Sequence, residues 1–297
     1  MIALLGLAFV VGVVAQSRFA VAGMRDALWQ LYFHGLAPIL VLATFASVEI
    51  AASLLLALGA AVIATWLAGA LAYAYSSLVA RDQRERGALA LTAAFGNTNA
   101  VGLPVAQLAF GSPGLELAVL YDRLAWLVPA QGVSTTVARV HSLPAGAGRI
   151  KLARIVLTNT PLFAMLIALV IRLVEVDVPI LDPVRRAVVA IVGPVAFLLL
   201  GLSLPLTRPS HTRDEVWRAL GAVVIRVVGG PLTLLAVAQM TTIDVPGVFY
   251  VLAGMPCAFH LLTLGRVYHL RPALIRFCIT VSTSAVLLAV GIGVAIR

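Results

Sequence analysis

Long apolar runs, interrupted by short stretches with charged residues, form the dominant pattern along this chain of 297 residues. A helix needs about 20 mostly apolar residues to cross the hydrocarbon core of a bilayer. Windows of that kind predict an all-α polytopic membrane protein with ten transmembrane helices. The predicted spans are residues 1–17, 29–48, 52–79, 88–110, 116–138, 153–174, 186–206, 217–240, 246–265 and 273–296.

The composition supports a membrane protein, because 62% of the residues are hydrophobic and only 11% are charged. Soluble domains lie outside these values. Residues 1–16 are apolar without a preceding basic segment, so we read them as a first span and not as a cleaved signal peptide. A formal net charge of +9 would suggest nucleic-acid binding in a soluble protein. Here the basic residues lie in short loops, where they indicate membrane topology.

Basic residues are concentrated in the loops that follow the odd-numbered spans, and the opposite loops hold few of them. Positive residues favour the cytoplasmic side of a membrane. We therefore expect a multi-pass protein of the cell (inner) membrane with both termini outside the cytoplasm. The cations assigned to the cytoplasmic side are Arg18, Arg25, Arg81, Arg84, Arg86, Arg139, Arg149, Lys151, Arg154, Arg208, Arg213, Arg218, Arg266, Arg271 and Arg276.

The two halves of the chain resemble each other in order and spacing. Residues 38–47, Pro-Ile-Leu-Val-Leu-Ala-Thr-Phe-Ala-Ser, correspond to residues 194–203, Pro-Val-Ala-Phe-Leu-Leu-Leu-Gly-Leu-Ser. Residues 58–63 and 220–225 correspond in the same way. Each half contains an odd number of predicted spans, so the copies would enter the membrane in opposite directions as a 5+5 inverted repeat. The predicted halves are residues 1–138 and 153–297, joined by a short cytoplasmic linker, residues 139–152.

Residues 95–104, Phe-Gly-Asn-Thr-Asn-Ala-Val-Gly-Leu-Pro, place polar and helix-breaking residues inside span 4. The corresponding span 9 contains Pro256, and proline and glycine both weaken a helix. Asn97 lies roughly 13 Å from the cytoplasmic end of its span and Pro256 roughly 15 Å from the outer end, at about 1.5 Å per residue. Both breaks are therefore predicted near the bilayer midplane. Irregular backbone is tolerated there only where it lines an enclosed or water-filled cavity.

The two breaks supply the candidate substrate-binding residues. Helix N-termini at such breaks present unpaired N–H groups and partial positive charge, which favour an anionic substrate. His260 follows Pro256 by one helical turn, on the same predicted face, where it could donate to a carboxylate or carry a coupled proton. A neutral histidine bonded to a carbonyl freed by the break is an equal alternative. The candidates are Asn97, Thr98, Asn99, Gly102, Pro104, Met255, Pro256, Cys257 and His260.

Several residues around the breaks carry a resemblance to a known family. They are Asn97-Thr98, Gly102-Leu103-Pro104, Met255-Pro256, Tyr268 and Pro272. Across the whole chain, this pattern resembles the auxin efflux carrier family, whose bacterial members resemble malonate and malate permeases. The chain departs from that family at His260 and at Gly265-Arg266. Substrate identity therefore stays open.

The resemblance implies an architecture similar to that of bile-acid/sodium symporters and sodium/proton antiporters, in which spans 4 and 9 cross at the substrate site. It also implies a scaffold domain, which commonly forms a homodimer, and a transport domain that moves against the scaffold. On this chain the scaffold would comprise residues 1–48 and 153–206, and the transport domain residues 52–138 and 217–297.

Charged residues inside predicted spans are functional candidates by default. Asp122 and Arg123 lie in span 5, and Arg226 lies in span 8. Snorkelling to the nearer interface is the alternative for Asp122 and Arg226. If both residues belong to the transport domain, as the resemblance implies, a salt bridge or polar gate between them is a reasonable hypothesis. All three residues are therefore candidates for gating or coupling.

The leading interpretation is a secondary active or facilitative transporter of a small organic anion, a carboxylate, with an elevator-type alternating-access mechanism. A channel or a ligand-sensing membrane receptor with the same fold is the alternative. An enzyme is not expected, because the sequence has no nucleophile elbow, zinc-protease or P-loop motif. Cys257 and Cys278 lie in predicted spans and indicate neither a disulfide framework nor a metal site. We expect the lipid bilayer and a second copy of the chain as partners, and no cofactor, metal or nucleic acid.

Overall fold

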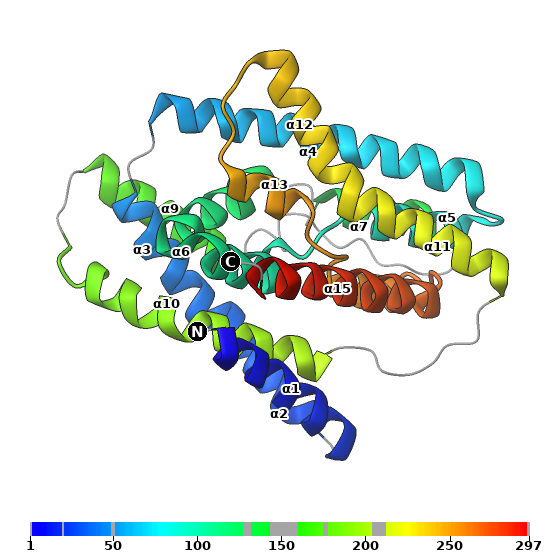
Figure 1. Cartoon of the computed structure of the whole chain (residues 1–297), viewed down its shortest axis with the longest axis horizontal. Coiled ribbons are helices and arrows are strands. Elements are labelled where there is room, and N and C mark those ends of the chain that lie inside the picture. The colour runs from blue at the N-terminus through cyan, green and yellow to red at the C-terminus, as the bar shows by residue number, and fades with distance from the viewer. Residues whose placement is uncertain are drawn as a thin grey trace. The chain divides into compact units, whose positions relative to one another are not determined.

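The computed structural model of the chain describes residues 2–19, 21–48, 51–126, 132–142, 160–174, 178–203 and 212–295. These residues fold into helices and form no β-sheet (Figure 1). Six of the described helices are long and apolar enough to cross a membrane, as a polytopic membrane protein requires. The number of spans and the inverted repeat stay predictions. The six are Gly23–Ser47, Ala52–Val79, Thr98–Trp126, Leu181–Ser203, Arg213–Thr241 and Pro272–Gly293.

The chain divides into two compact units. Unit 1 comprises Met1–Ala51, Asn99–Leu120 and Ile150–Leu204, and unit 2 comprises Ala52–Thr98, Tyr121–Arg149 and Pro205–Arg297. Residues 99–120 thus fall in unit 1, whereas the sequence assigned them to the transport domain. The physical reason is the contact of α6 (Leu103–Leu120) with α10 (Leu181–Ser203), where the Gln107 amide donates to Val189 O at 3.0 Å. The roles of scaffold and transport domain stay predictions.

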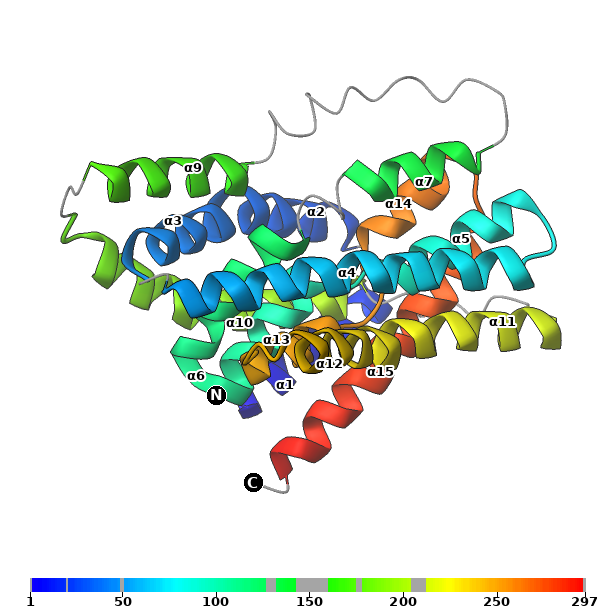
Figure 2. The same cartoon turned by 90° about the horizontal axis from the view of Figure 1, so that it is seen from above.

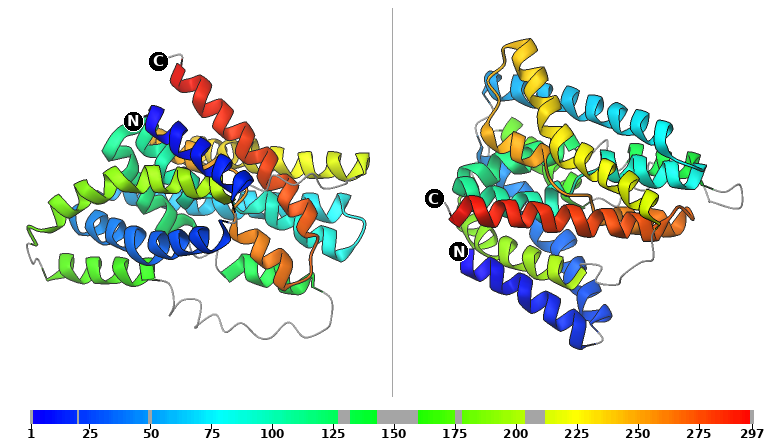
Figure 3. Two further views of the ribbon diagram at one scale, coloured as in Figure 1. Left: turned by 90° about the horizontal axis from the view of Figure 1, so that it is seen from below. Right: turned by 45° about the vertical axis from the view of Figure 1, so that its right-hand side comes forward.

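In unit 1, α1 (Ile2–Arg18) packs along α10, and α3 (Ala37–Ser47) packs along α9 (Thr160–Leu173) (Figure 3). Helices α1 and α10 come close at two glycines. A Cβ on Gly12 would lie 2.4 Å from Leu198 O, and a Cβ on Gly201 would lie 2.2 Å from Phe9 O. Larger residues at either position would push the two backbones apart. The remaining described elements of unit 1 are α2 (Ala22–Leu31) and η1 (Tyr32–Leu36), a π-helix.

Helix α6 bends at Gly111, whose φ of 69° is favourable for glycine. Pro113 follows in the same turn of chain and also interrupts regular helix geometry. The bend falls between the predicted spans 88–110 and 116–138, within one candidate span, Thr98–Trp126. The reversal of the chain between the two predicted spans stays a prediction. Beyond it, Glu116 forms a half-buried ion pair with Arg185 of α10.

In unit 2, α4 (Ala52–Val79) coincides with a predicted span and lies beside α5 (Gln83–Ala94) and α12 (Gly230–Thr241) (Figure 2). Apolar side chains of α5, α11, α14 and α15 form its core. Asp82 caps α5 by accepting from the Glu85 N–H at 2.8 Å. The other elements are η3 (Tyr121–Trp126), α7 (Ser134–Val140), α11 (Arg213–Val224), η5 (Ile225–Gly229), α13 (Gly247–Ala253), α14 (His260–Val267) and α15 (Pro272–Ala295), with η2 (Thr98–Gly102) at the junction of the two units.

Candidate functional site

The chain leaves the helical conformation at both positions where the sequence predicts a break. Helix α5 ends at Ala94, and the next helical residue is Thr98. Helix α13 ends at Ala253, and α14 begins only at His260. Each of these interruptions frees backbone groups that a continuous helix would have paired internally.

The two interruptions lie side by side in unit 2 and pair through their backbones. The Asn97 N–H donates to Pro256 O at 2.6 Å, and the Ala258 N–H donates to Phe95 O at 3.0 Å. Gly96 and Cys257 form an antiparallel bridge between these two hydrogen bonds. Backbone groups freed from two helices are thus satisfied by each other, as a low-dielectric environment demands.

Small and polar residues make this close approach possible. A Cβ on Gly96 would lie 3.1 Å from Met255 O, which is tighter than ordinary contact. The Cys257 N–H donates to Ser282 Oγ of α15 at 3.0 Å, and the Cys257 thiol donates to Thr92 O at 3.1 Å. We call the paired segments Phe95–Asn97 and Pro256–Ala258 the crossing. Cys257 is therefore part of its buried framework. Sequence reasoning missed Ser282, because a lone serine in an apolar helix gives no signal of its own.

Thr98 joins the crossing to the charged pair of η3. Its hydroxyl donates to the Asp122 carboxylate. The same carboxylate pairs with Arg123 at 2.8 Å, and both side chains are buried. The pair is consequently neutral as a whole, and it fixes the hydroxyl of Thr98 at the start of the half-helix.

Arg226 lies in η5 and is 3% exposed. Its Nη1 donates to Ala94 O at 2.5 Å, its Nη2 donates to Ala253 O, and its guanidinium carbon lies 5.5 Å from the centre of the Trp126 ring. The sequence suggested a salt bridge or polar gate between Arg226 and Asp122. The salt bridge is not formed, because Asp122 pairs with Arg123 and Arg226 binds backbone carbonyl oxygens; a polar gate stays a prediction. Every residue has a backbone carbonyl group, so the sequence does not indicate which of them will accept from an arginine.

The remaining candidate substrate-binding residues fall in different units. Asn97, Met255 and Pro256 are buried at the crossing in unit 2. Asn99, Gly102 and Pro104 belong to unit 1, where Asn99 O accepts a hydrogen bond of 3.5 Å from the Tyr32 hydroxyl.

His260 is exposed at the start of α14. The expectation that it shares a helix face with Pro256 is wrong, because residues 254–259 are not helical and the spacing of one turn does not apply.

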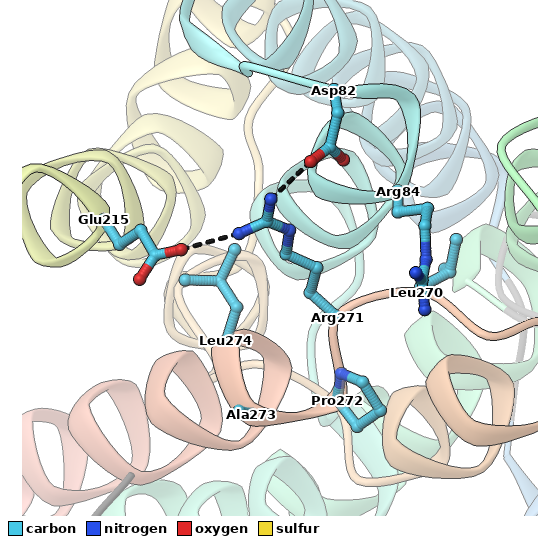
Figure 4. A pocket seen from close by; sticks show the side chains of 8 residues that line it. All are labelled: Asp82, Arg84, Glu215, Leu270, Arg271, Pro272, Ala273 and Leu274. Atoms are coloured by element: carbon cyan, nitrogen blue, oxygen red, sulfur yellow. Dashed lines mark hydrogen bonds and ion pairs between the residues drawn. The ribbon is translucent and has the colours of Figure 1, made fainter. Parts of the chain in front are cut away.

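A separate pocket of about 390 Å³, lined by both charged and apolar side chains, lies in unit 2 beside the first residues of α15 (Figure 4). Arg271 bridges two carboxylates there, donating to Asp82 and, at 2.6 Å, to Glu215. The hydrogen bond to Asp82 holds the pKa of the Arg271 guanidinium above its usual range. Burial raises the pKa of Asp82, but hydrogen bonds from Glu85 and Arg271 outweigh it and leave that pKa below its usual range. These ion pairs link the N-terminal ends of α5, α11 and α15 within unit 2.

No group of three or more His, Cys, Asp or Glu side chains in the described part of the chain is placed to hold a metal ion. Comparisons with protein-family models and with curated proteins find no match. The case for a function therefore rests on the residues and the geometry of the crossing.

Proposed function

We propose that this chain is a secondary active or facilitative transporter of a small organic anion, with a carboxylate as substrate. The observation that carries the proposal is the antiparallel pairing of two helix interruptions, Phe95–Asn97 with Pro256–Ala258, inside an apolar helical unit. A proline kink in a single helix needs no such partner. Two interruptions that satisfy each other are typical of the discontinuous helices that form transporter substrate sites.

The chemistry of the crossing favours an anion. Half-helices begin at Thr98 and at His260, and such N-termini carry partial positive charge and N–H donors. Asn97 carries an amide, a side chain that can donate hydrogen bonds to a carboxylate, while the Thr98 hydroxyl donates to Asp122. Arg226 adds a full positive charge beside the same backbone.

The proposal has further parts that follow from the sequence. We include ten spans in a 5+5 inverted repeat, both termini outside the cytoplasm, and likeness to the auxin efflux carriers. We also include an elevator-type movement of a transport domain against a scaffold domain, and a homodimer formed through the scaffold.

The test is uptake by purified protein in proteoliposomes, with labelled mono- and dicarboxylates under separately imposed pH, sodium and voltage gradients. A carrier gives saturable uptake that unlabelled substrate on the opposite side accelerates. A channel gives conductance far above about a thousand ions per second without counterflow, because it needs no conformational step per ion. Binding without uptake would indicate a receptor, and either of these last two results would overturn the proposal.

Asn97→Ala examines the site itself. Losing a hydrogen bond to a charged substrate costs about 1.5–3 kcal/mol, which lowers transport efficiency roughly 10- to 150-fold. Gln239→Ala is the matched control, since Gln239 is an exposed amide of α12 in the same unit. Uptake by Asn97→Ala equal to that of the control, with both proteins folded, would remove Asn97 from the substrate site.

A further inference from the structure

Two helices of unit 2 end at the crossing with their C-termini. Helix α5 ends at Ala94, and α13 ends at Ala253. The last carbonyl groups of a helix have no partner within it and carry the negative end of the helix dipole. In carriers with broken helices, such carbonyl groups coordinate the Na⁺ or proton that drives transport.

In this structure one guanidinium group occupies both ends. Arg226 donates from Nη1 to Ala94 O at 2.5 Å and from Nη2 to Ala253 O. Its Nε is buried and has no hydrogen-bond partner among the described residues, so the two carbonyl oxygens do not use all five N–H donors of the guanidinium. A planar fork with several donors can reach two acceptors at once, which an ammonium group on a flexible stem does less well.

The surroundings of Arg226 are shaped to hold it. A Cβ on Gly230 would lie 2.2 Å from Ala253 O and 2.7 Å from Arg226 Nη2, and a Cβ on Gly96 would lie 3.4 Å from Nε. A π-helix carries Arg226, and such single-turn insertions are frequent at functional sites. Trp126 offers the face of its ring to the guanidinium.

Among the residues that the structure describes, Arg226 pairs with carbonyl oxygens and with no carboxylate. Asp122, which accepts a hydrogen bond from the Thr98 hydroxyl at the crossing, pairs with Arg123. Arg226, Arg123 and Asp122 together therefore carry a net charge of +1, from two guanidinium groups and one carboxylate. The other carboxylates of unit 2 lie in loops or near helix ends: Asp82, Glu85, Asp214, Glu215 and Asp244.

We propose that Arg226 is a built-in cation of the transport site, a positioning residue that takes the place of a co-transported metal cation. It clamps the C-terminal ends of two half-helices and supplies the positive charge that the anion meets. This role builds on the proposed function, and it makes anion transport independent of Na⁺. Removing the guanidinium leaves two carbonyl ends that need another cation.

The experiment compares wild type with Arg226→Lys, Arg226→Gln and Arg226→Ala, and uses Arg213→Gln, an exposed arginine at the start of α11, as the matched control. Thermal unfolding of the purified proteins is recorded with millimolar guanidinium chloride or choline chloride. Uptake of the carboxylate panel is then measured in liposomes that contain sodium, potassium or N-methylglucamine chloride.

Guanidinium, but not choline, should raise the melting temperature of Arg226→Ala and leave wild type and Arg213→Gln unchanged. Wild-type uptake should be the same in all three salts. Arg226→Gln should lose at least about tenfold in kcat/KM, the equivalent of one charged hydrogen bond, and Arg226→Lys should recover part of that loss.

Three results would overturn the assignment: wild-type uptake that requires sodium, equal transport by Arg226→Lys and Arg226→Gln, or no stabilisation of folded Arg226→Ala by guanidinium. If Arg226→Ala does not fold in either salt, the comparison of transport by Arg226→Lys and Arg226→Gln tests the assignment. Absence of wild-type uptake of every carboxylate would refute the proposed function, while the unfolding measurements would still judge the clamp.

Discussion

Gly229 and Gly230 offer a sharp test of the packing around Arg226, because these neighbouring glycines have different surroundings. Both have helical dihedral angles, with φ of −62° and −58°, so alanine fits the backbone at either position. A Cβ on Gly229 would meet only the Ile225 side chain, at 3.7 and 3.9 Å. A Cβ on Gly230 would lie 2.2 Å from Ala253 O and 2.7 Å from Arg226 Nη2.

The expected effects have opposite signs. Gly229→Ala gains up to about 1 kcal/mol from helix propensity. Gly230→Ala gains the same amount but incurs about 1–3 kcal/mol for overpacking and about 1.5–3 kcal/mol for the displaced hydrogen bond of a charged group. Because these two penalties describe one displacement and do not add, we expect a net loss of about 0.5–3 kcal/mol, or roughly 1–12 °C in melting temperature for a unit of this size.

Thermal unfolding of both variants in the same detergent measures this difference. The Gly230→Ala protein should also lose uptake, because the contact between Arg226 and Ala253 O is displaced. Equal melting temperatures for the two variants would refute the close approach of η5, α12 and α13. A destabilised Gly230→Ala that transports normally would separate the packing from the role of Arg226.

Two further predictions concern other parts of the chain. Gly12→Leu should separate α1 from α10 and lower the unfolding free energy by about 1–3 kcal/mol. Gly6→Leu in the same helix should be neutral, because no atom lies within 4 Å of its Cβ position. Equal thermal shifts of the two variants would contradict the close packing of α1 on α10. Burial, and then the charge of Arg86, lower the pKa of His141 below its usual 6.5, so its contribution to stability is complete above about pH 6.5 and is lost as pH falls toward the folded value. Melting temperatures of wild type and His141→Gln measured from pH 8 to 5 should diverge in that window, and parallel curves would exclude the effect.

Hydropathy predicts the position of long apolar helices. The predicted span 52–79 coincides with α4 because both limits are set where apolar residues end. The breaks around Asn97 and Pro256 were visible because asparagine, glycine and proline are costly inside a helix. These signals depend on residues close together in the chain, so they can be recognised in a single sequence.

Contacts between distant segments were not visible in the same way. Residues 99–120 fall in unit 1 through the fit of α6 against α10, which hydropathy does not encode. The helical spacing used for His260 failed, since the break extends over residues 254–259. Sequence analysis identified Arg226 as a charge at membrane depth but assigned it to Asp122, because a carboxylate is the partner that a sequence can show.

The glycines beside Arg226 explain why its true partners are carbonyl groups. An arginine inside an apolar unit needs acceptors for its donors, and helix C-termini offer several together with partial negative charge but no formal one. Side chains at residues 96 and 230 would fill the space through which the guanidinium approaches the backbone. Had a carboxylate provided the partner, the pair would be neutral and the crossing would lose its attraction for anions. Arg226, Gly96 and Gly230 are therefore best understood as one unit, in which the two glycines let the guanidinium reach the carbonyl oxygens of Ala94 and Ala253.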